Sequence, residues 1–292
     1  MKKFYGTGVA IITPFNTDGT VDHTALKKLI NYLIDGGVQY LVSLGTTGET
    51  STLSNDEKKA VWDITAETID KRVPLVAGIG GNNTSEISSS LKSFNTDGFD
   101  AILSVSPYYS KPTQEGLYQH YKAVSDASSL PVILYNVPSR TGCNISVETI
   151  LRLAHDVKNI IGVKEASADF DQFNRIVKDK PDDFLFISGD DSITLPMVAL
   201  GAAGVISVAG NAFPKLVSTM VRLCLDGQFK EALPLHNSLV NITRLMFVDG
   251  SPAGVKAILK LLDLCGDTLR LPLVNVSSNT FDAINYELPK LR

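Results

Sequence analysis

The feature that most constrains the fold is a recurrence of short apolar runs, each followed by a segment with helical spacing. The runs recur at intervals of about 20 to 35 residues, which is typical of repeated βα units. They are nearly continuous in Val, Ile and Leu instead of alternating, so we expect both faces of each strand to be covered, as in a parallel sheet. The runs are "GVAIIT" from Gly8, "VQYLVSLG" from Val38, "VPLVAGI" from Val73, "DAILSVS" from Asp100, "PVILYNV" from Pro131, "NIIGVKE" from Asn159, "FLFISGD" from Phe184 and "AGVISVAG" from Ala203.

Such a series of units fits a closed (β/α)8 barrel best, with an open doubly wound sheet as the alternative. Helix signals agree, because Asp22 is a capping residue and Ser54 with Glu57 has the spacing of a capping box. After the eighth run, only helical patterns follow. We therefore predict an α/β fold, a (β/α)8 TIM barrel in residues 1–222 that holds the active site, with a C-terminal helical extension in residues 223–292.

Composition excludes several classes of function. The net charge of −4 provides no basic surface for nucleic acid. The first apolar stretch is broken by Pro14 and is too short for a signal peptide or a membrane span, so we expect a cytoplasmic protein. Three distant cysteines and four histidines form no zinc motif, and we expect neither disulfides nor a metal site.

In a barrel of this kind, working groups lie at the carboxyl ends of the strands and in the loops that follow. That rule selects a small set of segments in this chain. They are "GTTGE" (45–49), "SPYYSKP" (106–112), "YNVPSRTG" (135–142), "VKEAS" (163–167) and "SGDDS" (188–192).

Lys164 ends an apolar run, where a charged amine is unfavourable. An apolar pocket disfavours the ammonium form, and the neutral amine is the nucleophile that forms an imine with a ketone. The alternative is an ordinary ion pair with Glu165. Neighbouring residues of a strand point to opposite faces, which weakens this alternative.

The other segments carry groups that fit the same chemistry. "GTTGE" is either an anion-binding turn or a plain tight turn. Tyr135 can move a proton and Arg140 can grip a carboxylate, although a core tyrosine and a surface arginine would look the same. The tyrosine pair after Pro107 is more often packing than catalysis. The acids at 190 and 191 are interpreted as a helix cap.

Together these motifs resemble the dihydrodipicolinate synthase family of pyruvate-dependent lyases. The likeness covers essentially the whole chain and lies in the order, spacing and type of its motifs. The resemblance implies that Lys164, Tyr135, Thr47 and Tyr109 are catalytic, and that Thr46, Thr47, Arg140, Ile206 and Gly189 bind substrate. The motifs that carry it are "GTGVAIITPF", "GTTGE", "PYY", "YNVPSRTG", "GVKEAS", "SGDDS" and "VISVAGN".

By this resemblance Lys164 forms the imine with pyruvate, and Arg140 holds the carboxylate of the second substrate, L-aspartate 4-semialdehyde, in lysine and diaminopimelate biosynthesis. The protonated imine is itself the electron sink, so no metal or organic cofactor is expected. Thr47, Tyr135 and Tyr109 would relay protons. Tyr109 would come from a neighbouring subunit, which implies a homotetramer built from tight dimers.

Two alternatives remain at this point. Relatives with the same barrel and lysine act on N-acetylneuraminate or 2-keto-3-deoxygluconate, so the fold does not fix the aldehyde. Arg140 favours a substrate with a carboxylate. The neuraminate lyases resemble "YNIPxLTG" in this loop, with an apolar residue at the position where this chain has arginine. A catalytically inactive barrel that binds 2-oxo acids is the other alternative, and it would not need a proton relay.

Lysine-inhibited members of the family have an allosteric pocket next to "GTTGE". By the resemblance, Tyr108, Asn82 and Glu86 keep the expected types, whereas Asn55 and Lys58 replace two histidines. Lys58 would repel the ε-ammonium group of a bound lysine, so we expect weak inhibition or none. The alternative is that Lys58 points into solvent.

Overall fold

The computed structural model describes residues 1–291 and shows a closed barrel of parallel strands in the order β1 to β8. The barrel confirms the predicted fold and excludes the open sheet, because β1 pairs with both β2 and β8. The strands are β1 (Gly6–Ala10), β2 (Tyr40–Ser43), β3 (Leu75–Gly78), β4 (Ala101–Val105), β5 (Val132–Asn136), β6 (Ile160–Glu165), β7 (Leu185–Ser188) and β8 (Gly204–Ser207).

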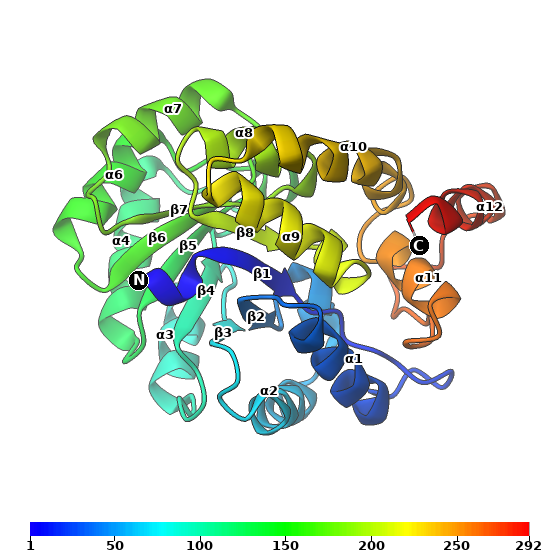
Figure 1. Cartoon of the computed structure of the whole chain (residues 1–292). Helices are drawn as coiled ribbons and strands as arrows, with labels where there is room; N and C mark the ends of the chain where they lie inside the picture. Colours follow the sequence, from blue (N-terminus) through cyan, green and yellow to red (C-terminus); the bar gives the residue numbers. More distant parts are fainter. Residues whose placement is uncertain (292) are drawn as a thin grey trace.

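Helices surround the barrel, and α10, α11 and α12 gather on one side of it (Figure 1). The α-helices are α1 (His23–Asp35), α2 (Asn55–Ile69), α3 (Thr84–Ser93), α4 (Gln114–Ala127), α5 (Pro138–Thr141), α6 (Val147–Asp156), α7 (Phe170–Asp179), α8 (Thr194–Ala199), α9 (Pro214–Leu225), α10 (Phe229–Leu245), α11 (Ala253–Leu261) and α12 (Ser278–Glu287). Short 3-10 turns are η1 (Lys2–Phe4), η2 (Thr46–Gly48), η3 (Thr50–Thr52), η4 (Asp191–Ile193), η5 (Ala209–Asn211) and η6 (Leu288–Leu291).

The predicted capping residues begin their helices. The side chain of Asp22 accepts a hydrogen bond from the backbone of Ala25, and Ser54 with Glu57 forms both bonds of a capping box. These bonds satisfy backbone N–H groups that the first turn of a helix leaves free. They fix where α1 and α2 leave the loops that carry the site.

The first strand lies earlier than the sequence predicts. It begins at Gly6 and ends at Ala10, where the side chain of Asn211 bonds to the backbone on both sides of Ile11. The Asn211 side chain accepts from the N–H of Ile12 at 3.2 Å and donates to the carbonyl of Ala10 at 2.8 Å. The chain therefore leaves the sheet at its carboxyl end and forms the loop before α1.

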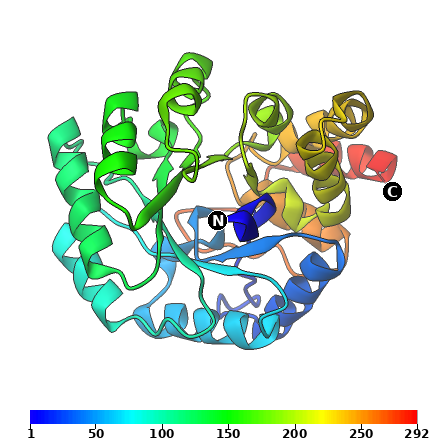
Figure 2. The same cartoon turned by 60° about the vertical axis from the view of Figure 1, so that its left-hand side comes forward.

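The inside of the barrel has its own apolar core. Phe4 and Tyr40 are fully buried and pack edge to face, with ring centres 5.6 Å apart. Figure 2 shows the N-terminal turn at the centre of the ring of helices. Tyr135 and Ile206 belong to the same interior cluster as Phe4. One end of the interior is thus filled by apolar side chains.

The predicted boundary between residues 222 and 223 falls within α9, which continues to Leu225. The division into a barrel and an extension stays a prediction. The last helix, α12, has Ser277 as its cap, whose side chain accepts from the backbone of Thr280. No helix of residues 1–291 has the length and hydrophobicity of a membrane span.

Candidate active site

Lys164 lies near the carboxyl end of β6 and is 5 % exposed. It pairs in register with Tyr135 of β5, and its Nζ lies 4.2 Å from the centre of the tyrosine ring. Tyr135 is also buried and lines a cavity at this end of the barrel. The lysine amine therefore stands against a phenol in an interior that is largely closed to water.

The alternative of an ion pair between Lys164 and Glu165 is wrong. The Glu165 carboxylate accepts hydrogen bonds from the side chains of Asn136 and Gln172, all at 3.0 Å, and from the N–H of Ser167 at 2.8 Å. Burial raises the pKa of Glu165, while these donors stabilise its charged form. Lys164 is thus left available for chemistry.

The Glu165 cluster is a part of the site that sequence reasoning missed. Asn136 pairs in register with Glu165, one residue beyond the pair of Tyr135 and Lys164. The Asn136 amide also donates to Asn144 at 2.7 Å and accepts from the N–H of Ile145 at 3.0 Å. The cluster ties β5 and β6 to the loop that follows α5. The only local signal was the asparagine after Tyr135.

The predicted anion-binding turn forms η2, directly after β2. Thr47 is buried, and Thr46 is exposed and lines the cavity. The hydroxyl of Thr50 donates to the carbonyls of Leu44 and Gly45 at 2.7 and 2.9 Å. The hydroxyl of Thr13 donates to the carbonyl of Gly48 at 2.7 Å. Hydrogen bonds from two threonine hydroxyls therefore hold the backbone at both ends of the turn.

Arg140 lies on the short helix α5 and is exposed at the cavity mouth. The cavity has a volume of about 470 Å³, enough for two small substrates. It brings Thr46, Tyr135 and Arg140 together, three of the residues predicted from the sequence. A cation at the mouth and a phenol inside suit an anionic ligand with a reactive carbonyl group.

Tyr109 is not brought into this cavity by its own chain. Its side chain is 90 % exposed, and its backbone has a φ of +74°, which non-glycine residues rarely adopt. Tyr108 beside it is 42 % exposed, so the interpretation of this pair as packing is wrong within the single chain. Tyr109 is therefore almost fully exposed in the single chain.

The ends of β7 and β8 carry the remaining residues. Ile206 is buried inside the barrel, and the N–H of Gly189 donates to the carbonyl of Glu165 at 2.7 Å. A Cβ atom at Gly189 would lie 2.7 Å from the Cβ of Ala166, so this close approach of two loops requires glycine. Their roles in substrate binding stay predictions.

The two acids after β7 have different partners. Asp190 caps η4 by accepting from the N–H of Ser192 at 2.8 Å, as predicted. Asp191 is not a cap; it accepts from the hydroxyl of Ser207 at 2.5 Å and from the N–H groups of Val208 and Ala209 at 2.9 Å. It therefore holds the end of β8, next to Ile206.

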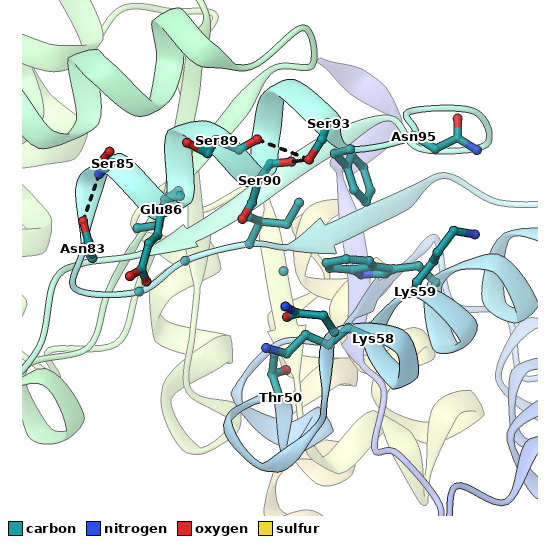
Figure 3. A pocket seen from close by; sticks show the side chains of 18 of the residues that line it. Thr50, Lys58, Lys59, Asn83, Ser85, Glu86, Ser89, Ser90, Ser93 and Asn95 are labelled. Carbon is teal, nitrogen blue, oxygen red and sulfur yellow. Dashed lines mark hydrogen bonds between the residues drawn. The ribbon is translucent and has the colours of Figure 1, made fainter.

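A second cavity, of about 810 Å³, lies between α2 and α3. It is lined by Asn55, Asn82, Glu86 and Tyr108, and Lys58 lines both cavities. Figure 3 shows the Lys58 side chain extending from α2 past Thr50, whereas Lys59 runs the other way. Because Lys58 is half-buried and lines the cavity, the alternative of a fully solvent-directed lysine is wrong. Within residues 1–291 no cluster of His, Cys, Asp and Glu could hold a metal ion.

The model of the dihydrodipicolinate synthetase family matches residues 3–290. The chain belongs to this family. It is 54 % identical over 293 aligned residues to a 4-hydroxy-tetrahydrodipicolinate synthase of Flavobacterium psychrophilum, covering 99 % of this chain and 100 % of that protein. The expected family, barrel fold and enzyme class are confirmed, and the chain is a lyase of this family.

Solved structures agree over nearly the whole length. A monomeric dihydrodipicolinate synthase variant is 38 % identical with a TM-score of 0.96, covering 99 % of this chain and 97 % of that one. The Acinetobacter baumannii enzyme complexed with pyruvate is 39 % identical with a TM-score of 0.95, covering 98 % of each chain. The Cyanidioschyzon merolae enzyme with lysine bound is 34 % identical with a TM-score of 0.95, covering 99 % of this chain and 98 % of that one.

Proposed function

We propose that this chain is a 4-hydroxy-tetrahydrodipicolinate synthase, which condenses pyruvate with L-aspartate 4-semialdehyde through an imine on Lys164. One observation carries the proposal: a buried lysine, whose neighbouring carboxylate is held elsewhere, stands 4.2 Å from the ring of Tyr135 beside a cavity with Arg140 at its mouth. The name of the Flavobacterium relative and the pyruvate complex of the Acinetobacter enzyme support it.

The amine of Lys164 attacks the ketone carbon of pyruvate and gives a carbinolamine, which loses water to form a protonated imine. Loss of a proton from the methyl group then gives an enamine. Its carbon attacks the aldehyde carbon of the second substrate, whose oxygen takes up a proton, and the imine to Lys164 forms again. The amino group of the semialdehyde then attacks the imine carbon and displaces Lys164, which closes the ring and frees the enzyme. Tyr135, whose ring lies beside the Lys164 amine, is the group that moves these protons in this proposal, because a phenol can do so without carrying a permanent charge.

Thr46 and Thr47 bind the pyruvate carboxylate in this proposal, with backbone groups near Ile206 and Gly189. Arg140 takes the carboxylate of the semialdehyde in a bidentate contact. The imine supplies the electron sink, so the reaction proceeds without a metal or organic cofactor. These roles suit hydroxyls and phenols, which can move protons without carrying a permanent charge.

We further propose a homotetramer of tight dimers in which Tyr109 completes the site of the partner subunit. The exposed tyrosine with its strained backbone supports this assembly, because such a conformation persists only where other contacts hold it. A cytoplasmic location fits the three unpaired cysteines, which are usual in a reducing compartment.

A coupled assay with pyruvate and L-aspartate 4-semialdehyde tests the function, run beside the same assay with N-acetylmannosamine as the aldehyde. We expect turnover only with the semialdehyde. Turnover only with the sugar would favour a neuraminate-type lyase. No turnover with either aldehyde, together with reversible pyruvate binding, would indicate the inactive binding barrel.

A further inference from the structure

The C-terminal helices contain a second buried lysine. Lys256 of α11 is completely buried, and its Nζ lies 2.5 Å from Oε1 of Glu49 and 2.9 Å from the carbonyl oxygen of Thr268. The same nitrogen lies 4.2 Å from the centre of the Phe15 ring. Lys256 is therefore fully paired, in contrast to Lys164. Burying both charges costs desolvation free energy, which only a close ion pair with further hydrogen bonds offsets.

Glu49 is the last residue of "GTTGE" and directly follows the turn of Thr46 and Thr47. Its backbone has a φ of +52°, in the left-handed region, and links η2 to η3. Its second carboxylate oxygen accepts from the N–H of Arg270 at 3.2 Å. A strained residue keeps such a conformation only when its surroundings fix it. Here the surroundings are Lys256 and Arg270.

Arg270 adds a second anchor at the same place. Its guanidinium binds both carboxylate oxygens of Glu57 at 2.5 and 2.9 Å, and it donates to the carbonyls of Gly19 and Thr52. The guanidinium carbon, Cζ, lies 4.5 Å from the centre of the Phe15 ring. The loop before α1, the turn η3 and the start of α2 thus all meet one segment beyond the barrel.

We propose that Lys256 is a positioning residue for pyruvate, and that through its ion pair with Glu49 it holds the turn of Thr46 and Thr47 in the shape that binds the substrate carboxylate. This inference rests on the proposed function. A site of hydroxyls and backbone groups must be held to within about 0.5 Å of its productive geometry, and rigid support behind it provides this accuracy. The C-terminal helices are then part of the binding apparatus for the first substrate.

The test is the pyruvate dependence of adduct formation with borohydride in the full-length protein. In Lys256→Met, which keeps an unbranched side chain one atom shorter and loses its charge, we expect the half-saturating pyruvate concentration to rise about tenfold or more. The rate at saturating pyruvate should stay within about threefold, because Lys164 and Tyr135 are untouched. Lys260→Met removes an exposed lysine from the same helix and should leave both quantities unchanged.

Lys256→Met leaves Glu49 buried without its cation, so it could fail to fold. The double variant Lys256→Met/Glu49→Gln removes both charges and avoids this cost. We expect its melting temperature to be nearer the wild-type value, while its half-saturating pyruvate concentration stays raised. A folded double variant with wild-type pyruvate saturation would overturn the proposal, as would equal effects in Lys260→Met.

The wild-type protein separates this inference from the proposed function. If wild-type protein forms no adduct with pyruvate, the proposed function fails. If it forms the adduct and Lys256→Met saturates at the same pyruvate concentration, only the positioning role fails.

Discussion

Lys164 and Tyr135 stand opposite each other on neighbouring strands, with the lysine nitrogen 4.2 Å from the centre of the tyrosine ring. A second buried lysine, Lys256 of the C-terminal helix α11, lies at the same distance from the centre of the Phe15 ring. Within residues 1–291, only the second is paired with an acid. Burial alone therefore does not identify the nucleophile, and the position of the nearest carboxylate distinguishes the two residues.

We predict that pyruvate and borohydride modify Lys164 and not Lys256. Lys256 is held in an ion pair with Glu49, whereas Lys164 has no carboxylate partner within residues 1–291 and lies beside Tyr135, where the proposed mechanism places the ketone. Mass spectrometry of digested protein should find about one reduced pyruvate adduct per chain, on the peptide that contains Lys164. Lys164→Ala should form no adduct. An adduct on another lysine, or trapping by Lys164→Ala, would contradict the assignment.

We predict that Arg140→Ala impairs use of the semialdehyde far more than it impairs trapping of pyruvate. In the proposed mechanism the guanidinium contacts only the second substrate, and loss of a bidentate charged contact should cost about 2 to 4 kcal/mol in kcat/KM for that substrate. Arg140→Lys should recover little, because an ammonium group lacks the planar fork. Steady-state kinetics beside borohydride trapping measure the two effects, and equal losses would refute the role.

We predict that two inactive variants restore activity when they are assembled together. Lys164→Ala lacks the nucleophile and Tyr109→Phe lacks the phenol, but a mixed dimer contains one site with an intact lysine and the partner's tyrosine. Random mixing of equal amounts should recover about a quarter of the wild-type activity. Subunits exchanged in mild denaturant and then assayed provide the measurement. Mixtures that stay as inactive as the separate variants would exclude a shared site.

We predict that L-lysine inhibits this enzyme weakly or not at all. Lys58 lines the cavity between α2 and α3, and a like-charge contact with a bound lysine costs about 1 to 4 kcal/mol in a partly buried site. Affinity should fall about tenfold to nearly a thousandfold. Titration of L-lysine into the coupled assay tests this, and half-inhibition at submillimolar lysine would refute it. Lys58→His should gain inhibition, whereas Lys122→His, which changes an exposed lysine of α4 that is paired with Asp126 and lines neither cavity, should not.

We predict that His120 makes the protein less stable in mild acid. The ring is buried on α4, its Nδ1 lies 2.8 Å from the Thr84 hydroxyl, and its Nε2 has no partner within the described chain. Desolvation lowers the pKa of His120 to about 4, from 6.5 in the unfolded chain. The unfolded state therefore binds more protons between these values, and stability falls as pH drops from about 6.5 to about 4.

The free energy of unfolding falls by about 3 kcal/mol at most through this residue. Thermal unfolding across this range should show a flatter pH dependence in His120→Gln than in the wild-type protein. His155→Gln, which changes an exposed histidine, should keep the wild-type dependence. If all three proteins respond alike, His120 does not contribute to the acid sensitivity.

Much of the fold, and the strand ends where the site was expected, could be predicted because these features have local sequence signals. Continuous apolar runs indicate strands covered on both faces, and the residue after each run marks the working end of the barrel. This rule selected Lys164, Tyr135 and Arg140, whose roles in the reaction stay predictions. Asp191 was misread because its partners lie on the next strand, at Ser207 and beyond. Lys256 and Glu49 are 207 residues apart, and no local pattern signals such a contact.

The shared register of β5 and β6 also determines which changes this site can survive. Tyr135 and Lys164 form one pair across the strands, and Asn136 with Glu165 forms the next pair. Because successive residues of a strand face opposite sides, a single-residue insertion or deletion in both strands would exchange the two pairs. An amide and a carboxylate would then face the substrate, and a phenol and an amine would face the helices. A substitution therefore changes one group of this site, whereas a change of one residue in the length of both strands changes all four.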